Sequence, residues 1–121
     1  MKVYIIEDEL LGLNRLYRLL EEVNPGIELL GHAETIKSAV SWLQNNPPPD
    51  LIFMDIELAD GQCFEIFNQV EVKTPLIFTT SYDEYALDAF KVNSIDYLLK
   101  PINREDLQRS LDKYHNLKKQ L

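Results

Sequence analysis

Cysteine and histidine are scarce in this sequence. Its 121 residues include one cysteine, Cys63, and two histidines. A single cysteine cannot form an internal disulfide, and the counts also exclude a cysteine-rich zinc site and a multi-histidine metal centre. One thiol is compatible with a reducing compartment, so we expect a cytoplasmic protein.

Basic residues and long apolar runs are also lacking. Twelve Lys and Arg stand against twenty Asp and Glu, which gives a net charge of −8. This chain by itself is therefore a poor candidate for binding nucleic acid or an anionic membrane. The apolar runs are far shorter than the ~20 residues that span a bilayer. Acidic residues at positions 7 and 8 come too early for a signal peptide.

Length and composition are those of an ordinary globular domain. The chain is 45% hydrophobic and 26% charged. A domain of about 100–150 residues can bury a sizeable core without disulfides. We expect one domain over residues 1–121, with no internal linker.

Short apolar runs, each followed at once by polar residues, predict the strands. The runs are rich in β-branched and aromatic side chains, which is typical of strands buried on both faces of a parallel sheet. Two weaker strands are expected beside them. The five expected strands are residues 3–6, 28–33, 51–54, 76–79 and 95–99.

Between these runs, apolar residues recur at intervals of three and four, which is the period of a helix. Pro25-Gly26 ends the first helix, Thr35 is the expected N-cap of the second, and Asn103 that of the last. We expect the last helix to bury a stripe that includes Leu117. The five expected helices contain the sets Leu10/Leu13/Tyr17/Leu20, Ile36/Ala39/Val40/Leu43, Phe64/Phe67/Val70, Tyr85/Ala86/Ala89/Phe90 and Leu107/Leu111/Tyr114/Leu117.

Strands and helices therefore alternate five times along the chain. This pattern predicts an α/β fold with a doubly wound, five-stranded parallel sheet. Ligands of such sheets bind beyond the carboxyl ends of the strands. The residues at those ends are Glu7 and Asp8, Asp55, Thr79 to Ser81, and Lys100 with Pro101. We expect Glu7, Asp8 and Asp55 in one crevice, because the first, third and fourth strands are the most apolar and hence central.

Three carboxylates in one crevice repel one another. At about 5 Å and an effective dielectric near 20, each pair repels by ~3 kcal/mol, or ~10 kcal/mol for three pairs. Lys100 alone cannot offset this, but Mg²⁺ can, because it prefers carboxylate oxygens. An aspartate carboxylate is also a competent nucleophile toward phosphorus. The pattern therefore favours Mg²⁺-dependent formation of an aspartyl phosphate, with a lysine and a hydroxyl holding phosphoryl oxygens.

Two other functions fit an α/β sheet of this kind. A flavodoxin-like cofactor binder would need a Ser/Thr/Gly-rich phosphate loop after the first strand, where this chain has Glu7, Asp8 and Glu9. A Mg²⁺-dependent phosphohydrolase with an Asp nucleophile would normally need a substrate cap, for which the chain has little room.

The motifs at the strand ends resemble the receiver domain of bacterial two-component response regulators. The matching residues are Glu7-Asp8, Asp55 after Phe53-Met54, Thr80 and Lys100-Pro101. Residues 78–86 and 95–102 are similar to the LytTR-type subfamily in particular. The resemblance covers essentially the whole chain and implies a flavodoxin-like sheet of strand order 2-1-3-4-5.

For the acidic site, the resemblance implies one role per residue. Asp55 would be the phosphoacceptor. Asp8 and Asp55 would bind Mg²⁺ directly, Glu7 through water, and the backbone carbonyl of Glu57 would be a further ligand. Lys100 would contact the phosphoryl group.

For the conformational switch, the resemblance implies a second set of roles. Thr80 would move toward the phosphoryl oxygen, and Tyr97 would turn inward as it does so. Ser81 would leave the phosphoryl group access. The Lys100-Pro101 bond would be cis and would direct the lysine into the crevice.

Two features depart from the family pattern. The first acidic residue is Glu7 rather than aspartate. The loop of residues 56–61 is shorter than usual and lacks the common Met-Pro, which leaves the path of this loop and the Glu57 carbonyl ligand open.

The resemblance also implies partners. A sensor histidine kinase would supply the phosphoryl group, and a homodimer could form through the fourth helix, fifth strand and fifth helix. Control of transcription would need a C-terminal DNA-binding domain outside this chain. The alternative is a single-domain phosphorelay receiver without its own output domain.

Overall fold

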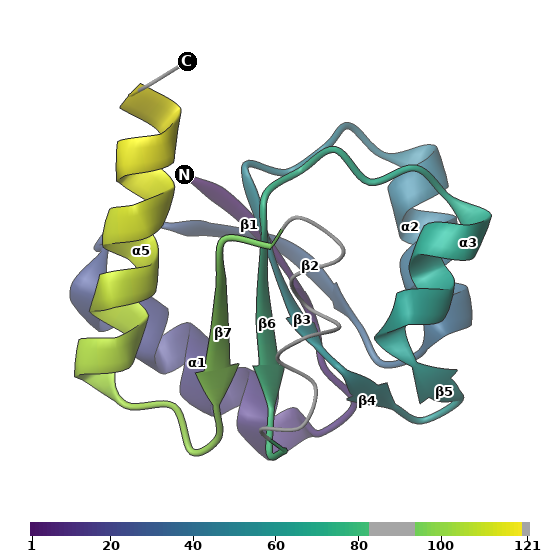
Figure 1. Ribbon diagram of the computed structural model, residues 1–121, viewed down its shortest axis with the longest axis horizontal. Helices are drawn as coiled ribbons and strands as arrows, with labels where there is room; N and C mark the ends of the chain where they lie inside the picture. Colours follow the sequence, from purple (N-terminus) through teal and green to yellow (C-terminus); the bar gives the residue numbers. More distant parts are fainter. Residues whose placement is uncertain (83–93, 120–121) are drawn as a thin grey trace.

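A five-stranded parallel sheet with strand order β2-β1-β3-β6-β7 forms the centre of the computed structural model (Figure 1). The structure describes residues 1–82 and 94–119. The sheet strands are β1 (Lys2–Ile6), β2 (Glu28–Ala33), β3 (Leu51–Asp55), β6 (Leu76–Thr80) and β7 (Asp96–Leu99). Because β6 and β7 are the fourth and fifth strands of this sheet, the expected order 2-1-3-4-5 is confirmed.

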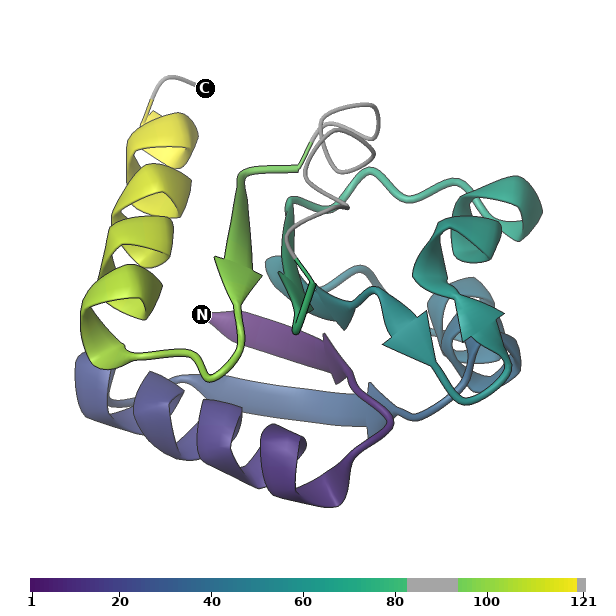
Figure 2. The same cartoon turned by 60° about the horizontal axis from the view of Figure 1, so that its bottom comes forward.

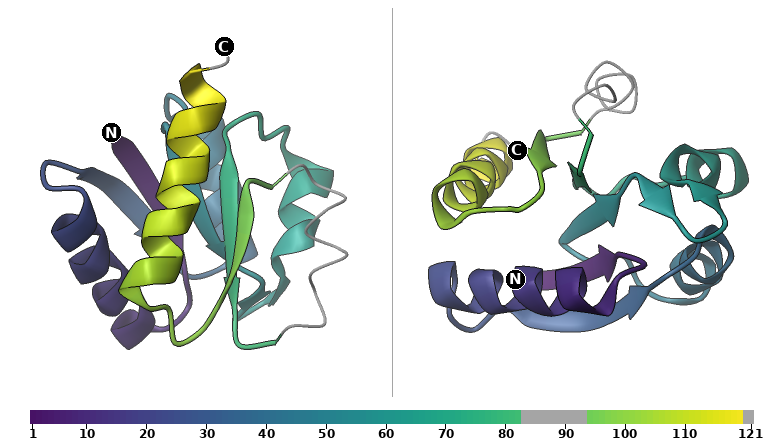
Figure 3. Two further views of the ribbon diagram at one scale, coloured as in Figure 1. Left: turned by 60° about the vertical axis from the view of Figure 1, so that its left-hand side comes forward. Right: turned by 90° about the horizontal axis from the view of Figure 1, so that it is seen from below.

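Helices cover both faces of the sheet. The α-helices in the described residues are α1 (Leu10–Val23), α2 (Ile36–Asn45), α3 (Ile66–Gln69) and α5 (Arg104–Lys119). Helices α1 and α5 lie on one face and α2 and α3 on the other, as Figure 1 and both views of Figure 3 show. The molecule is therefore a three-layered α/β domain.

Strand side chains alternate between two separate core clusters. Val3 and Ile5 pack with the cluster under α1 and α5, whereas Tyr4 and Ile6 pack with the cluster under α2 and α3. All four side chains are buried. This two-sided burial explains why the strand sequences are unbroken apolar runs.

Local sequence signals determine where the helices begin and end. The Thr35 hydroxyl accepts a hydrogen bond from the Ser38 backbone N–H at 3.0 Å, so Thr35 caps α2. The Asn103 side chain accepts one from the Asp106 N–H at 2.8 Å at the start of α5. Gly26, with φ +90°, follows the end of α1. All three signals act as expected.

Several local predictions need correction. Leu10 (63% exposed) and Leu117 (43% exposed) face solvent, because each lies near a helix end where little packs over it. The third helix is only Ile66–Gln69, preceded by the 3₁₀ turn η1 (Cys63–Glu65), and Val70 lies just beyond it. The expected helix containing Tyr85 and Phe90 lies outside the described residues.

A short antiparallel hairpin was not expected. Strands β4 (Glu57–Leu58) and β5 (Gly61–Gln62) pair beyond the end of β3. In Figure 2 the hairpin lies beside α2 and α3. The hairpin contains most of the loop of residues 56–61, which is shorter than the family pattern.

Two further features concern packing and membranes. Trp42 stacks on Tyr4 with ring centroids 3.9 Å apart, a contact typically worth about 1 kcal/mol beyond burial. Trp42 is therefore a packing residue. None of the helices in the described part of the chain has the length and apolar content to span a bilayer.

Candidate functional site

The carboxyl ends of β1, β3, β6 and β7 meet at one edge of the sheet, the lower edge in Figure 1. Backbone pairing continues just beyond these ends. The Glu7 N–H donates to the Ala33 carbonyl at 2.8 Å, and the Lys100 N–H donates to the Thr80 carbonyl at 2.7 Å. The loops that follow the strands are thus held to the sheet, and their side chains start from fixed positions.

Three carboxylates converge at this edge. Glu7, Asp8 and Asp55 each offer one oxygen, and these atoms lie within 4.8 Å of one another. Glu7 is 4% exposed and Asp55 5% exposed, whereas Asp8 is half-buried. Glu7 and Asp8 follow β1, and Asp55 ends β3. The strand order makes these two strands neighbours, so the expected juxtaposition is observed.

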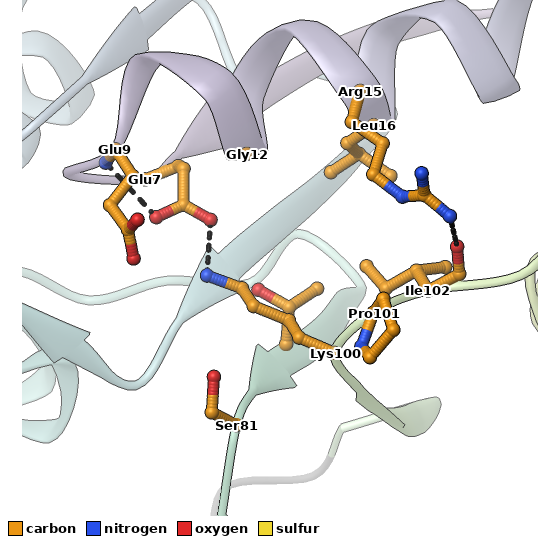
Figure 4. A pocket seen from close by; sticks show the side chains of 10 residues that line it. Glu7, Glu9, Gly12, Arg15, Leu16, Ser81, Lys100, Pro101 and Ile102 are labelled. Atoms are coloured by element: carbon orange, nitrogen blue, oxygen red, sulfur yellow. Dashed lines mark hydrogen bonds and ion pairs between the residues drawn. The ribbon is translucent and has the colours of Figure 1, made fainter.

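Lys100 bridges two of the three carboxylates. Its Nζ lies 2.5 Å from Glu7 Oε1 and 3.0 Å from Asp55 Oδ2. Figure 4 shows the lysine reaching from the end of β7 toward Glu7. The Lys100–Pro101 peptide bond is cis, as the resemblance implied. One ammonium therefore faces two buried carboxylates.

The pKa values reflect this excess of negative charge. Burial is the largest cause that raises the pKa of Glu7, followed by the neighbouring Asp55 carboxyl group. Burial and the neighbouring Glu7 raise the pKa of Asp8. Burial alone would lower the pKa of Lys100, but its contacts with Glu7 and Asp55 outweigh burial and raise it. The carboxylates hold the lysine charged, and one lysine does not fully compensate them.

A hard divalent cation fits this donor set. Carboxylate oxygens are the ligands that Mg²⁺ prefers, and converging acids with raised pKa values have charge left to neutralise. Glu7, Asp8 and Asp55 could hold the ion. Glu57 lies at the rim of the same hollow, where its N–H donates to Asp55 Oδ1 at 3.2 Å. A backbone carbonyl ligand from Glu57 stays a prediction.

Two hydroxyl groups, of Thr80 and Tyr97, come from the strands β6 and β7 that follow β3 in the sheet. Thr80 is 1% exposed, and its Oγ1 accepts a hydrogen bond from the Tyr82 N–H at 3.2 Å. The Tyr97 hydroxyl donates to the Tyr82 backbone carbonyl. Two hydrogen bonds through Tyr82 thus connect Thr80 with Tyr97, the two residues expected to form a switch.

Two adjoining hollows share Glu9, Ser81 and Lys100. The smaller, of about 190 Å³, is lined by Asp8, Glu9, Asp55, Glu57, Thr80, Ser81, Tyr82 and Lys100, whereas Glu7 lines the larger. The larger, of about 340 Å³, lies between α1 and the segment after β7 (Figure 4). Ser81 lines both hollows, and its role in leaving the phosphoryl group access stays a prediction.

Arg15 and Asp60 carry no site signal in the sequence. Arg15 Nη2 donates to the Ile102 carbonyl at 3.2 Å and joins α1 to the segment that follows Lys100 (Figure 4). Asp60 contacts the start of α2. Both contacts join segments distant in sequence, so spacing alone could not reveal them.

Cys63 is fully buried, and burial raises the pKa of its thiol, which makes it an inert packing residue.

Comparison with known proteins identifies the family. The model for the response regulator receiver domain matches residues 3–112. This chain belongs to the response regulator receiver family. The match covers nearly every element described above, including all four strand ends that form the acidic site.

The curated relatives of this receiver domain are LytTR-type response regulators. This chain is 40% identical over 121 residues to the sensory transduction protein LytT of Bacillus anthracis. The alignment covers 98% of this chain and 48% of that protein. The chain is 37% identical to the transcriptional regulatory protein LytR of Staphylococcus aureus strain N315, covering 93% of this chain and 46% of the relative. The chain thus spans about half the length of these relatives.

Solved structures show the same fold. The response regulatory domain of mrkE from Klebsiella pneumoniae is 31% identical, with a TM-score of 0.84 and full coverage of both chains. A CheY-like receiver domain from Methanospirillum hungatei, 22% identical, has a TM-score of 0.81 and covers 99% of this chain and 98% of its own. The second likeness supports the fold alone.

Proposed function

We propose that this receiver domain accepts a phosphoryl group from a histidine kinase on Asp55, with Mg²⁺ bound between the acidic side chains, and changes conformation as a result. The observation that carries the proposal is the convergence of Glu7, Asp8 and Asp55 beside Lys100. The domain is a signalling switch that promotes phosphorylation of its own aspartate, rather than an enzyme that turns over a small substrate.

The transfer step needs only groups at this edge of the sheet. An Asp55 oxygen forms a bond to phosphorus as the N–P bond of the kinase phosphohistidine breaks, and the histidine nitrogen keeps the electron pair of that bond. When bound, Mg²⁺ supplies positive charge shared by the carboxylates and the phosphoryl oxygens. Lys100, at 3.0 Å from Asp55 Oδ2, donates to an oxygen of the phosphoryl group on that carboxylate.

The response to phosphorylation begins at Thr80. Its hydroxyl accepts from the Tyr82 N–H and still has its own proton to donate. Phosphorylation adds strong acceptor oxygens, and Thr80 moves to donate to one of them. Because Tyr82 is bonded to both Thr80 and Tyr97, that movement changes the support of the Tyr97 hydroxyl and lets the ring turn inward.

The proposal extends to partners and location. A sensor histidine kinase supplies the phosphoryl group, and the cytoplasm, where ATP is available to such kinases, is the proposed location. The curated relatives include a transcriptional regulatory protein, so we propose an output in transcription through a DNA-binding domain outside this chain. The active form dimerises through β7, α5 and the expected helix containing Tyr85 and Phe90, which lies outside the described residues. A single-domain phosphorelay receiver is the alternative.

Labelling by a small phosphodonor tests the proposal without the kinase. Acetyl phosphate with Mg²⁺ is expected to add one phosphoryl group to the protein, seen as a single mass increase in intact mass spectrometry. EDTA is expected to prevent the reaction. Asp55→Asn keeps the size and shape of the side chain but removes the nucleophile, so we expect no labelling of this variant.

Asp50→Asn provides the matched control. Asp50 precedes β3 at the opposite end from the site, where its side chain accepts from the Lys2 N–H. The control is expected to label like the parent protein. Full labelling of Asp55→Asn, or labelling that is indifferent to EDTA, would contradict the proposal.

A further inference from the structure

Asp60 connects the β4–β5 hairpin to the start of α2. Its Oδ1 accepts a hydrogen bond from the Ile36 N–H at 2.7 Å, and its Oδ2 accepts from the Lys37 N–H at 3.3 Å. These are the first two residues of α2, whose N–H groups have no partner within the helix. The bond from Ile36 is the largest cause that lowers the pKa of Asp60. Asp60 is therefore a charged cap supplied from another element.

Helix α2 already has a cap of its own. Thr35 Oγ1 accepts from the Ser38 N–H at 3.0 Å, and the Ala39 N–H donates to the Thr35 carbonyl at 3.0 Å. Thr35 and Asp60 thus serve different N–H groups of the same helix. Asp60 also fixes the hairpin to α2, because its own backbone belongs to the hairpin. The capping bonds of Thr35 stay within α2 and do not hold the hairpin.

The hairpin also lies directly against Ile36. Gly61 has φ +140°, and a Cβ atom added there would lie 3.2 Å from Ile36 Cδ1. The positive φ favours glycine at this position, and a Cβ there would press on the end of the Ile36 side chain. Asp60 and Gly61 together place the tip of the hairpin on the first residue of α2.

The other end of the hairpin leads to the phosphoacceptor. The Ile56 N–H donates to the Thr79 carbonyl at 3.0 Å, and the Cys63 N–H donates to the Ile56 carbonyl at 2.7 Å. Between these bonds and Asp60, the main chain of Glu57 is held from both sides. Its N–H lies 3.2 Å from Asp55 Oδ1, at the rim of the acidic hollow.

We propose that Asp60 is a positioning residue for the cation site. By fixing the hairpin on α2, it holds the Glu57 backbone beside Asp55, and its loss weakens Mg²⁺ binding although Asp60 itself touches neither the acidic trio nor the cation. This inference rests on the proposed function, because it assumes that Mg²⁺ binds at Glu7, Asp8 and Asp55.

Mg²⁺ titration by calorimetry tests the inference. The parent protein is compared with variants of Asp60 and Thr35, each made in the full chain. Asp60→Ala is expected to weaken Mg²⁺ binding about tenfold, at the lower end of the range for residues that support metal ligands. Thr35→Ala is the matched control, because it removes the other cap of the same helix. It is expected to lower the thermal midpoint comparably and to leave the Mg²⁺ affinity unchanged.

A charge effect must be separated from a positioning effect. Removing any acidic residue can weaken cation binding through space, but salt screens that contribution. The expected loss in Asp60→Ala persists in high salt. Asp60→Asn keeps one carbonyl oxygen for the Ile36 N–H and is expected to bind Mg²⁺ with intermediate affinity, so it carries the test if Asp60→Ala fails to fold. The Glu57 amide resonance is expected to shift in metal-free Asp60→Ala and not in Thr35→Ala.

The outcomes distinguish the two claims. If the parent protein binds no Mg²⁺, the proposed function fails. If the parent binds Mg²⁺ and the Asp60 variants bind it equally well, or Thr35→Ala weakens binding as much as Asp60→Ala, the positioning role of Asp60 is overturned. A loss that disappears in high salt overturns it as well.

Discussion

At the level of single residues, Lys100 offsets part of the negative charge of the acidic site. Its ammonium lies within 3.0 Å of both Glu7 and Asp55, and both carboxylates are almost fully buried. Without this cation, two carboxylates would face each other in a site largely closed to water. Removing one partner from a buried ionic cluster leaves the other charges uncompensated.

Lys100→Met is therefore expected to destabilise the metal-free protein by about 2 kcal/mol, less than for a fully buried pair because Lys100 is partly exposed. Urea unfolding in EDTA measures this loss. Added Mg²⁺ is expected to restore most of it, because the ion neutralises the same carboxylates. Lys73→Met is the control, since Lys73 pairs with Glu71 at 3.8 Å on the open surface. Equal losses in the two variants would contradict the account.

The sequence predicts the residues of the acidic site well because their position follows from one rule. Glu7, Asp8, Asp55 and Lys100 each lie at the end of a strand or just beyond it, and parallel strands place such residues at one edge. Arg15 and Asp60 follow no such rule. Asp60 is 24 residues from its partner Ile36, and only the folded chain brings them together.

Elements with two-sided burial are the easiest to predict. The strands β1, β3 and β6 are apolar runs because both of their faces meet helices, and their approximate bounds follow from the sequence. The hairpin β4–β5 could not be predicted, because two-residue strands have no detectable period. Leu10 and Leu117 fit a helical period, yet the period says nothing about how far the sheet extends under each helix.

Under the proposed function, we expect Thr80 at the end of β6 and Tyr97 in β7 to change their surroundings. Addition of beryllofluoride with Mg²⁺, which mimics a phosphoryl group on a carboxylate, is expected to shift the NMR signals of Thr80, Tyr82 and Tyr97. Residues at the far end of α2, such as Asn45, are expected to change little. A silent spectrum at Thr80 and Tyr97 in a protein that binds the mimic would contradict the switch.

Over the whole molecule, the acidic site and Asp96 affect stability in opposite directions with pH. Mainly burial raises the pKa of Glu7 above its ordinary 4.5 and that of Asp8 above 3.8. Near these pKa values the folded protein binds more protons than the unfolded chain. The free energy of unfolding therefore falls as the pH rises past the ordinary pKa values of the two carboxyl groups. Burial acts to raise the pKa of Asp96, but bonds from Ser110, Tyr97 and Lys113 outweigh burial and lower it below 3.8, so its contribution is lost only below that value.

The metal-free protein is therefore expected to lose stability as the pH rises above 4.5 and 3.8, the ordinary pKa values of Glu7 and Asp8. Urea midpoints in EDTA measure the trend. Glu7→Gln is expected to remove most of the slope, and Mg²⁺ to flatten it, because a bound cation favours the ionised carboxylates. A metal-free stability that rises over this range would show that the acidic trio does not carry the excess charge inferred here.

The identity of the phosphorylated residue tests the central claim most directly. After reaction with acetyl phosphate and Mg²⁺, borohydride reduces an aspartyl phosphate to homoserine, which tandem mass spectrometry locates in the peptide map. We predict homoserine at position 55 and at no other position. Reduction at another acidic residue, or none in a protein that has gained a phosphoryl group, would contradict the account.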